Sequence, residues 1–491
     1  MRAIESRAPW FFSILPVLFA VPFALLISQT SPSISLLVAA AAVPLLIAFL
    51  SPLTGLFLLV FSMLLGPEFL VGGIGIGSGN TLGRGVTLRF DDFLLVLVGV
   101  GWLGRVAVSD HDKVFVRTPL NRSIVLYTAA CVFATLIGIL IGQVRPMGGL
   151  FFLLKYYEYF FLFYMTVNLV KTPEQVRQLV TASLVTCAIV SLYAISQIPS
   201  GMRVSAPFEG QDGEPNTLGG YLVFLMALIG GLLATPGAVK TKWPLMALLA
   251  VAGFALQATL SRSSFLAAGV VMVGFIVFLR RRSPALVAIV LVGCLALAVL
   301  APQAVVDRVT YTFEQPKEEG QIKVGKLRLD TSTSERIGSW RAAFEVWQKS
   351  PLWGHGVTGG PFMDAMYPRV LVEVGLLGAC AFAALLYAIY RTGMTSHAHF
   401  EDPYLRGLAL GFLMGFIGLL THALGSNTFI IVRIMEPFWL VAGLLVKSLL
   451  LDQQKGVASD EQNSQPVPSV RTKWPIGPTV PRSQSFPNSA L

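Results

Sequence analysis

Long runs of apolar residues alternate with short polar connections along most of the chain. A membrane-spanning helix needs about 20 predominantly apolar residues, and somewhat fewer where other helices surround it. On that rule the pattern predicts about fourteen helices, which cover residues 10–28, 34–50, 52–66, 92–108, 123–143, 148–170, 174–197, 218–235, 243–260, 263–279, 284–301, 367–390, 405–422 and 428–450. Only Ser51 and Pro52 separate the second from the third, so these two are also compatible with one re-entrant pair. The predicted fold is all-α, a polytopic integral membrane protein with about 12–14 transmembrane helices.

Composition supports this class of fold and indicates which kinds of molecule the protein contacts. Hydrophobic residues make up 54% of the 491 residues, charged residues make up 13%, and the mean hydropathy is +0.70, which ordinary soluble domains do not show. The net charge of +10 is carried by short basic clusters between apolar runs, where Lys and Arg orient spans and meet lipid head groups. We therefore expect membrane lipids as partners and no nucleic acid. Single cysteines without CxxC spacing indicate buried apolar residues rather than disulfides or metal ligands; they are Cys131, Cys187, Cys294 and Cys380.

Basic residues also predict the orientation, because basic connections stay on the cytoplasmic side. One side of the predicted spans collects Arg2, Arg7, Arg105, Lys113, Arg117, Arg122, Lys171, Arg177, Lys240, Lys242, Arg280, Arg281, Arg282 and Arg391. This agreement indicates an even number of spans with both termini cytoplasmic. The segments 67–90, 199–217 and 302–366 then lie on the opposite side, which we name the outer side.

The two ends of the chain differ in character. Basic residues precede the first apolar run, but no convincing small-residue cleavage site lies near Ser28, so we expect a retained first span. Residues 452–491 are rich in Ser, Pro, Gln and Gly and lack an apolar period. They predict a disordered cytoplasmic tail behind a transmembrane domain of residues 1–451.

The long outer segment contains a helix of unusual polarity. Ser332 and Glu335 have the spacing of a capping box, and Pro351 ends the pattern. At about 100 degrees per residue, one narrow sector of this amphipathic helix holds Arg336, Trp340, Ala343 and Trp347. Arg336 therefore shares the apolar face, either to reach a membrane-proximal cavity or to extend to lipid phosphates from an interfacial helix.

A second arginine begins a span on the same side. Arg262 follows Ser261 at the predicted start of the span 263–279, where a charge can reach the head-group layer. Two guanidinium groups that converge on one outer cavity match a diphosphate, because planar guanidinium forks bind phosphate oxygens in bidentate fashion.

Four segments, in this order, resemble the O-antigen ligase and polysaccharide polymerase superfamily. They are PFEGQDGEPNTLGGYL at 207–222, TLSRSSFLA at 259–267, SERIGSWRAAFEVWQKSPLWGHGVTGG at 334–360 and DAMYPRVLVEVGLLG at 364–378. The resemblance extends over about residues 155–450, while the first spans are only compatible with it. It implies a metal-independent, inverting glycosyltransferase without a cofactor, and it associates Arg262 and Arg336 with the diphosphate of the donor.

The implied donor is an oligosaccharide on a polyprenyl diphosphate, such as undecaprenyl diphosphate, on the outer leaflet of the bacterial inner (plasma) membrane. The implied acceptor is a glycan or a lipid. A leaving diphosphate gains charge as the glycosidic bond breaks, so fixed positive groups favour the transition state over the ground state. The sequence shows no DxD or His-rich cluster in its outer loops, which agrees with metal independence.

The chain departs from the ligase pattern where ligases usually carry His and Asn, because it has Asp364 and Ala365 there. Asp364 is a candidate general base in place of that His, or an amino-terminal cap for the following span. His355 is a rival base, or a loop residue near the head groups.

Three further residues are candidates for substrate binding. Asn216 occupies the family's PN position and either binds a sugar or the diphosphate, or caps the span near Leu218. Glu209 belongs to an acidic loop with Asp212 and Glu214 and is an alternative base. Trp340 lies on the same helix as Arg336.

Two pairs of opposite charge lie within spans, and we expect each to form an internal ion pair. They are Lys155 with Glu158 and Arg433 with Glu436.

Polymerisation of lipid-linked repeat units into a surface polysaccharide is the favoured function. The alternative is an O-antigen ligase that transfers the glycan to a lipid or protein acceptor. A flippase for lipid-linked glycans is the alternative of another class, but it needs charged residues along several spans, whereas the polar candidates gather on the outer side.

Overall fold

The computed structural model describes residues 43–71, 86–108, 116–209, 213–280, 331–361 and 363–463, with a few residues between 310 and 328. The chain divides into two compact units, residues 1–451 and 452–491, and the following concerns the first. The predicted spans 10–28 and 284–301 lie outside the described residues, as do residues 464–491 of the predicted tail.

The fold is all-α with many apolar helices, as predicted. In chain order, its elements are α3 (Pro52–Leu65), β1 (Glu68–Val71), β2 (Val86–Arg89), α4 (Phe90–Val108), α5 (Asn121–Leu140), α6 (Pro146–Leu169), α7 (Pro173–Ser196), η1 (Ile198–Ser200), α8 (Pro215–Ala234), α9 (Trp243–Ala258), α10 (Arg262–Leu279), β3 (Lys323–Val324), β4 (Leu327–Arg328), α13 (Thr331–Trp347), α14 (Met366–His399), α15 (Pro403–His422), η2 (Thr428–Ile430) and α16 (Val432–Asn463).

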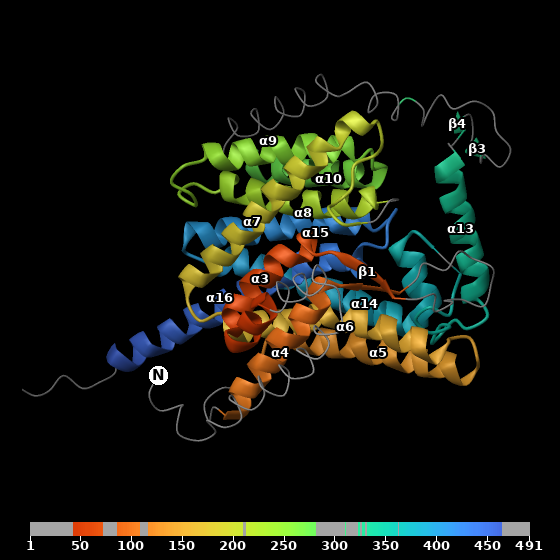
Figure 1. Cartoon of the computed structure of the whole chain (residues 1–491), viewed down its shortest axis with the longest axis horizontal. Coiled ribbons are helices and arrows are strands. Elements are labelled where there is room, and N and C mark those ends of the chain that lie inside the picture. The colour runs from red at the N-terminus through yellow and green to blue at the C-terminus, as the bar shows by residue number, and fades with distance from the viewer. Residues whose placement is uncertain are drawn as a thin grey trace, which may run out of the picture. The chain divides into compact units, whose positions relative to one another are not determined.

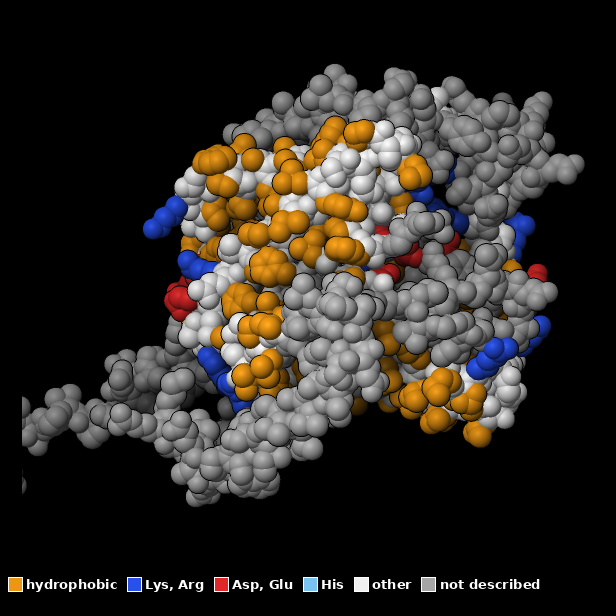
Figure 2. Space-filling view, in the orientation of Figure 1, with side chains coloured by type: hydrophobic (Ala, Val, Ile, Leu, Met, Phe, Trp, Pro, Cys, Tyr) orange, Lys and Arg blue, Asp and Glu red, His pale blue; other side chains and the backbone are white. Residues whose placement is uncertain are grey.

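Eight described helices are long and apolar enough to cross a membrane, namely α5, α6, α7, α8, α10, α14, α15 and α16, and α3 and α9 are shorter apolar helices. The boundaries follow the predicted spans closely, because apolar length and flanking polar residues are both visible in the sequence. The main differences are α14, which continues to His399, and α16, which continues to Asn463 beyond the predicted start of the tail. Figure 2 shows apolar side chains spread over the visible face of the bundle, as expected of a surface that meets lipid.

Helix α8 lies at the centre of the bundle, against α9, α10 and α15 (Figure 1). In the most apolar stretch of α8, 83% of the residues are buried. The corresponding share is 33% for α5 and for α10, which are peripheral. Glycines allow the backbones of α8 and α15 to touch, because a Cβ at Gly231 would overlap Gly407 and Gly411. Small residues at such contacts let membrane helices pack closely.

A buried ionic network ties α4, α6 and α16 together. Arg89 pairs with Asp91 and with Glu436, whose Oε2 lies 2.9 Å from Nη2 of Arg89, and at most 7% of each side chain is exposed. Lys155 lies 2.5 Å from Asp92 and 3.1 Å from Glu158. The predicted pair of Lys155 and Glu158 is therefore confirmed.

The predicted pair of Arg433 and Glu436 is wrong. Arg433 instead donates to Glu68 at 2.9 Å and to the carbonyl oxygen of Pro207 at 3.0 Å, while Glu436 bonds Arg89. The strands β1 and β2 pair in antiparallel register with Glu68 opposite Arg89. They bring closer partners to α16, which local spacing on a helix cannot reveal.

Helix α14 is interrupted at Gly375, whose φ of 63° and ψ of −168° are not helical. The preceding turn, residues 351–356, supplies partners for the backbone groups that the interruption leaves without helical bonds. These bonds run from Leu376 N to Pro351 O at 2.9 Å, from Leu377 N to Leu352 O at 3.1 Å, from His355 N to Val372 O at 2.9 Å and from Gly356 N to Glu373 O at 2.8 Å. Broken spans are tolerated where protein satisfies their backbone in this way. The segments PLWGHG and EVGLLG thus form one structural joint.

We expect Gly375→Ala to destabilise the fold by about 1–3 kcal/mol. Its φ is positive, and a Cβ there would overlap the carbonyl oxygen of Leu352. Thermal unfolding of the purified protein in detergent checks this. Gly338→Ala is the control, because Gly338 lies in α13 with nothing within 4 Å of a new Cβ, so alanine should be neutral or stabilising there. Equal unfolding midpoints for the two variants would contradict the role of the joint.

Candidate functional site

The first turn of α10 carries Arg262, one of the two predicted diphosphate ligands. Ser261 is the N-cap of this helix and its hydroxyl accepts from the Ser264 amide, so Arg262 is the first helical residue. The turn before it is tight, since Leu260 has a φ of 51°. Arg262 is half-buried and stands where the helix presents its unbonded amides and positive dipole end. This end of α10 is therefore suited to an anion.

Arg336 reaches the same place from α13. A Cβ built at Gly425 would lie 3.2 Å from Nη1 of Arg336 and 3.3 Å from Cβ of Ser263. The Arg336 guanidinium thus lies beside the residue that follows Arg262, although 74 positions separate the two arginines in the chain (336 − 262). The structure brings these two predicted diphosphate ligands to one end of the bundle.

Helix α13 runs across the ends of the spans (Figure 1). Its buried contact is Ala343, 1% exposed, which packs with Met363 and Val372. Trp340 remains 40% exposed, and Phe344 is 50% exposed. The predicted apolar face is therefore divided, with one part against α14 and the other open.

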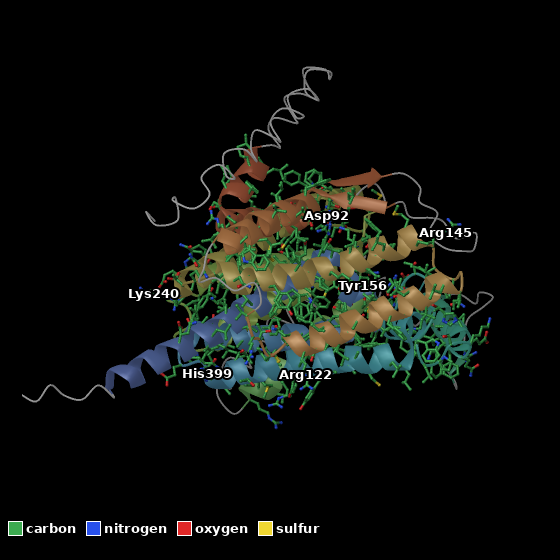
Figure 3. The ribbon with its side chains drawn as sticks, turned by 90° about the horizontal axis from the view of Figure 1, so that it is seen from below. Asp92, Arg122, Arg145, Tyr156, Lys240 and His399 are labelled. Atoms are coloured by element: carbon green, nitrogen blue, oxygen red, sulfur yellow. The ribbon has the colours of Figure 1, made fainter. Side chains whose placement is uncertain are left out.

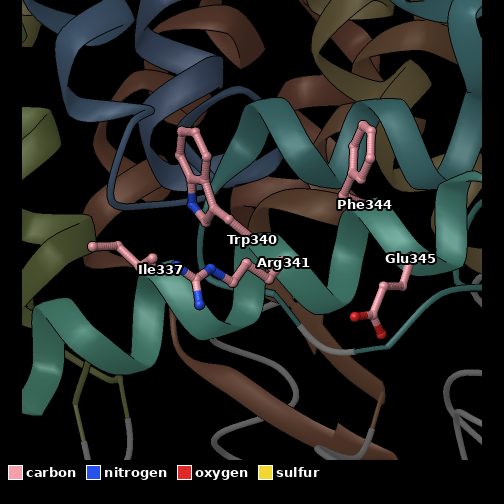
Figure 4. Close-up of a pocket in the computed structure, with 5 residues that line it drawn as sticks. All are labelled: Ile337, Trp340, Arg341, Phe344 and Glu345. Carbon is pink, nitrogen blue, oxygen red and sulfur yellow. The ribbon is translucent and has the colours of Figure 1, made fainter. Parts of the chain in front are cut away.

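The open part of α13 lines a surface hollow of about 390 Å³, formed by Ile337, Trp340, Arg341, Phe344 and Glu345 (Figure 4). Trp340 and Phe344 also border a second hollow of about 230 Å³ against the start of α14. Trp340 therefore offers an aromatic face beside Arg336, one helical turn away.

Asn216 lies in the first turn of α8. This helix begins at Pro215 and its N-cap is Glu214, so the prediction that Asn216 caps the span is wrong. Its Oδ1 accepts a hydrogen bond of 2.7 Å from the Ser261 hydroxyl. Asn216 is thereby hydrogen-bonded to the N-cap of α10, the residue before Arg262.

Asp364 is exposed, and it does not cap α14, because the N-cap there is Ala365 without a side-chain bond. The chain around it is held along the loop that follows α15. Asn427 Nδ2 donates to Met363 O at 2.6 Å, and Met366 N donates to Ala423 O at 3.1 Å. This loop also contacts Arg336 through Gly425, so Asp364 stands at the same end as the arginines.

His355 is placed differently. Only 4% of it is exposed, and its Nδ1 lies 3.2 Å from the Val372 carbonyl oxygen inside the joint with α14. This contact gives the ring a structural partner within the protein.

Glu209 is also buried, with 4% of its side chain exposed. It accepts from the amides of Ala206 at 3.1 Å and Glu214 at 2.9 Å, and so it organises the loop that leads to α8. Burial raises the pKa of Glu209 to about 7, against the opposing effect of Arg433. Its neighbour Asp212 lies outside the described residues.

We expect Glu209 to make stability depend on pH. Because the folded protein holds this proton where the unfolded chain has released it, the stabilisation is fully present below a pH of about 4.3 and is lost as the pH rises through about 7. Glu209→Gln should flatten this part of the profile, measured as unfolding midpoints between pH 4.5 and 8. Glu401→Gln, an exposed carboxyl, should keep the wild-type slope. An unchanged slope in Glu209→Gln would refute this assignment.

His422, at the end of α15, was not among the residues predicted from the sequence. This ring is fully buried, with Nδ1 2.8 Å from Thr428 Oγ1 and Nε2 3.2 Å from Ser264 Oγ. The available signal was a single His at the outer end of an apolar run. Among the described residues, no three His, Cys, Asp or Glu side chains are grouped as a metal site.

Comparison with known proteins agrees with this geometry. Residues 245–379 match the family model of the O-antigen ligase. The matched part holds α9, α10, α13 and the first part of α14, and therefore both arginines and Asp364. No curated protein matches the chain. This match supports a place for the chain in the O-antigen ligase superfamily and glycan transfer of the ligase or polymerase type.

Proposed function

We propose that this protein is a membrane glycosyltransferase that polymerises oligosaccharide repeat units carried on a polyprenyl diphosphate. The observation that supports it best is the position of the Arg336 guanidinium beside Ser263, next to Arg262 at the amino end of α10. Two fixed positive charges and a helix amino terminus form a site for a diphosphate.

The reaction in this proposal is displacement at the anomeric carbon. An acceptor hydroxyl attacks that carbon, the bond to the diphosphate oxygen breaks, and the diphosphate leaves with the bonding electron pair. Arg262 and Arg336 stabilise the charge that grows on the leaving group, so they lower the energy of the transition state more than that of the ground state. Inversion of the anomeric centre follows from a single displacement.

Asp364 is the proposed general base, because it is the exposed carboxyl on the segment held beside the arginines. It takes the proton of the attacking hydroxyl. His355 is disfavoured because its ring is buried in the joint with α14. Trp340 supplies an aromatic surface for the apolar face of a sugar or for the carrier, in the open hollow on α13.

The outer leaflet is the proposed location. Helices α8 and α10 start at the site and run away from it, so Lys240, Lys242 and Arg280 follow their far ends. Figure 3 shows Lys240 and His399 at one end of the bundle and Arg145 at the other. The positive-inside rule makes the end with most basic connections cytoplasmic, which favours an outer site in a bacterial inner membrane.

Reconstitution tests the proposal and separates its alternatives. The purified protein is placed in vesicles with a polyprenyl diphosphate repeat unit, and product length is followed on a gel. A ladder supports the polymerase. Transfer of one unit to an added lipid acceptor supports the ligase instead, and movement of the unit across the bilayer without bond cleavage supports a transporter.

Asp364→Asn should lower the transfer rate by about a hundredfold or more. The amide keeps the size of the side chain but cannot accept the proton of the acceptor. The rate is measured in the same vesicles, with Glu174→Gln, an exposed carboxyl at the start of α7, as the control. Wild-type turnover in Asp364→Asn would show that Asp364 is not the general base.

A further inference from the structure

A continuous chain of hydrogen bonds crosses from α15 to α8 beneath the site. His422 Nε2 lies 3.2 Å from Ser264 Oγ. Ser264 Oγ lies 2.7 Å from Ser261 Oγ, which lies 2.7 Å from Asn216 Oδ1. We name these four side chains the relay. It joins three helices at the level of Arg262.

Three of the four relay side chains are buried and closely packed. His422 and Ser264 are fully buried, and Ser261 is 1% exposed. Two glycines of α8 make room for them, since a Cβ at Gly219 would overlap Ser264 Oγ, and one at Gly220 would lie 3.0 Å from Cε1 of His422. Buried polar groups in such surroundings must be bonded, and the low dielectric strengthens each bond.

The hydrogens of the relay must all run in one direction, because each hydroxyl has one hydrogen to donate. An amide oxygen only accepts, so Ser261 donates to Asn216 Oδ1. Ser264 then donates to Ser261, and its oxygen accepts from the Nε2–H of His422. With Nε2 protonated, Nδ1 of the ring accepts from the Thr428 hydroxyl at 2.8 Å, a closer partner of that hydroxyl than the Ser426 carbonyl oxygen at 3.5 Å.

This direction has a consequence for Asn216. With Oδ1 held by Ser261, the NH2 group of the same amide is turned away from the relay. An NH2 group donates to anions, whereas an amide oxygen in its place would repel them. Without the relay the amide is free to rotate, and its oxygen can then take the place of its NH2 group.

His422 also lies near the other side of the site. Gly425, three residues after His422, lies beside the Arg336 guanidinium. The relay therefore extends from the neighbourhood of Arg336 to the side chain that borders Arg262.

We propose that His422 and Ser264 are positioning residues which, through Ser261, hold the Asn216 amide with its NH2 group toward the diphosphate of the donor. This inference rests on the proposed function, and it adds Asn216 as a third, uncharged donor to the two arginines. His422 itself is buried and does not touch the substrate.

The test measures binding directly, apart from glycan transfer. Farnesyl diphosphate in detergent micelles is titrated into the protein by calorimetry. Ser264→Ala should weaken binding about tenfold, because one hydrogen bond to a charged group is lost. Asn216→Ala should weaken binding equally. The double variant should be no weaker than either single variant, because both changes remove the same interaction.

Two further variants separate positioning from packing. The amide nitrogen of His422→Gln can take the place of Nε2–H, so this variant should retain most of the affinity, while His422→Leu should lose about tenfold. Ser448→Ala removes a buried hydroxyl that bonds only its own helix in α16, and it should bind as the wild type does.

The outcomes distinguish this inference from the proposed function. If the wild-type protein does not bind farnesyl diphosphate, the proposed function fails, and the inference fails with it. If binding occurs and the losses of Ser264→Ala and Asn216→Ala add up in the double variant, the relay does not act through Asn216 and only the inference is overturned. Loss of binding in His422→Gln to the level of His422→Leu would overturn it as well.

Discussion

Arg336→Ala should lower the rate of glycan transfer by at least about a hundredfold while the protein remains folded. The guanidinium lies in the site beside Ser263, whereas α13 packs against Met363 and Val372 through Ala343. Because the charge of the leaving diphosphate develops during bond cleavage, the loss should appear mainly in kcat. The measurement is initial rate in vesicles at saturating donor.

The matched control is Arg391→Ala on α14. Arg391 is exposed and lies far along α14 from its start at Met366, so its loss should change the rate only slightly. Arg336→Lys keeps the charge but not the planar fork, and it should recover only part of the activity. Arg262→Ala should resemble Arg336→Ala. Full turnover in either alanine variant would remove that arginine from the mechanism.

The largest effect on stability is expected at Arg89. Removing it by Arg89→Ala leaves Asp91 and Glu436 buried without their cation, which should cost about 3–5 kcal/mol. The network holds two cations against four carboxyls, Asp91, Asp92, Glu158 and Glu436. Loss of Arg89 leaves two buried carboxyls without their donor, whereas loss of one carboxyl leaves both cations with a partner.

Glu436→Gln should accordingly cost less than Arg89→Ala, because the amide oxygen still accepts from Arg89. The exposed pair of Arg177 and Asp402, 2.7 Å apart with 52% and 33% of the side chains exposed, is the control. Arg177→Ala should lose less than about 1 kcal/mol. Unfolding in detergent by heat or denaturant ranks the three variants, and the reverse order would show that the buried charges do not stabilise the fold as described.

Much of the fold could be predicted from the sequence. The apolar runs located α3 and α5 to α10 closely, because the length of a span and the polar residues at its ends are local properties. The pair of Lys155 and Glu158 was also predicted, since both residues lie on one turn of a helix. The resemblance in four short segments pointed to the family whose model matches residues 245–379.

Partners that come from distant parts of the chain could not be predicted in this way. Arg433 and Glu436 are neighbours on α16, yet β1 and β2 bring Glu68 and Arg89 to them. His355 was predicted to be a rival base or a loop residue near the head groups. In the structure it is buried against the part of α14 that precedes the interruption at Gly375.

The amino-acid sequence by itself determined the class of fold and the order of the helices. It also pointed to Arg262 and Arg336 as candidate ligands, because hydrophobic length and residue type are local properties of the chain. Only the tertiary structure decided that the starts of α8 and α10, the end of α15 and the helix α13 meet at one end of the bundle. It also revealed His422, whose role depends on groups from three helices. Close contact between helices depends on long-range packing through glycines, and no pattern within a single segment encodes which ends will meet.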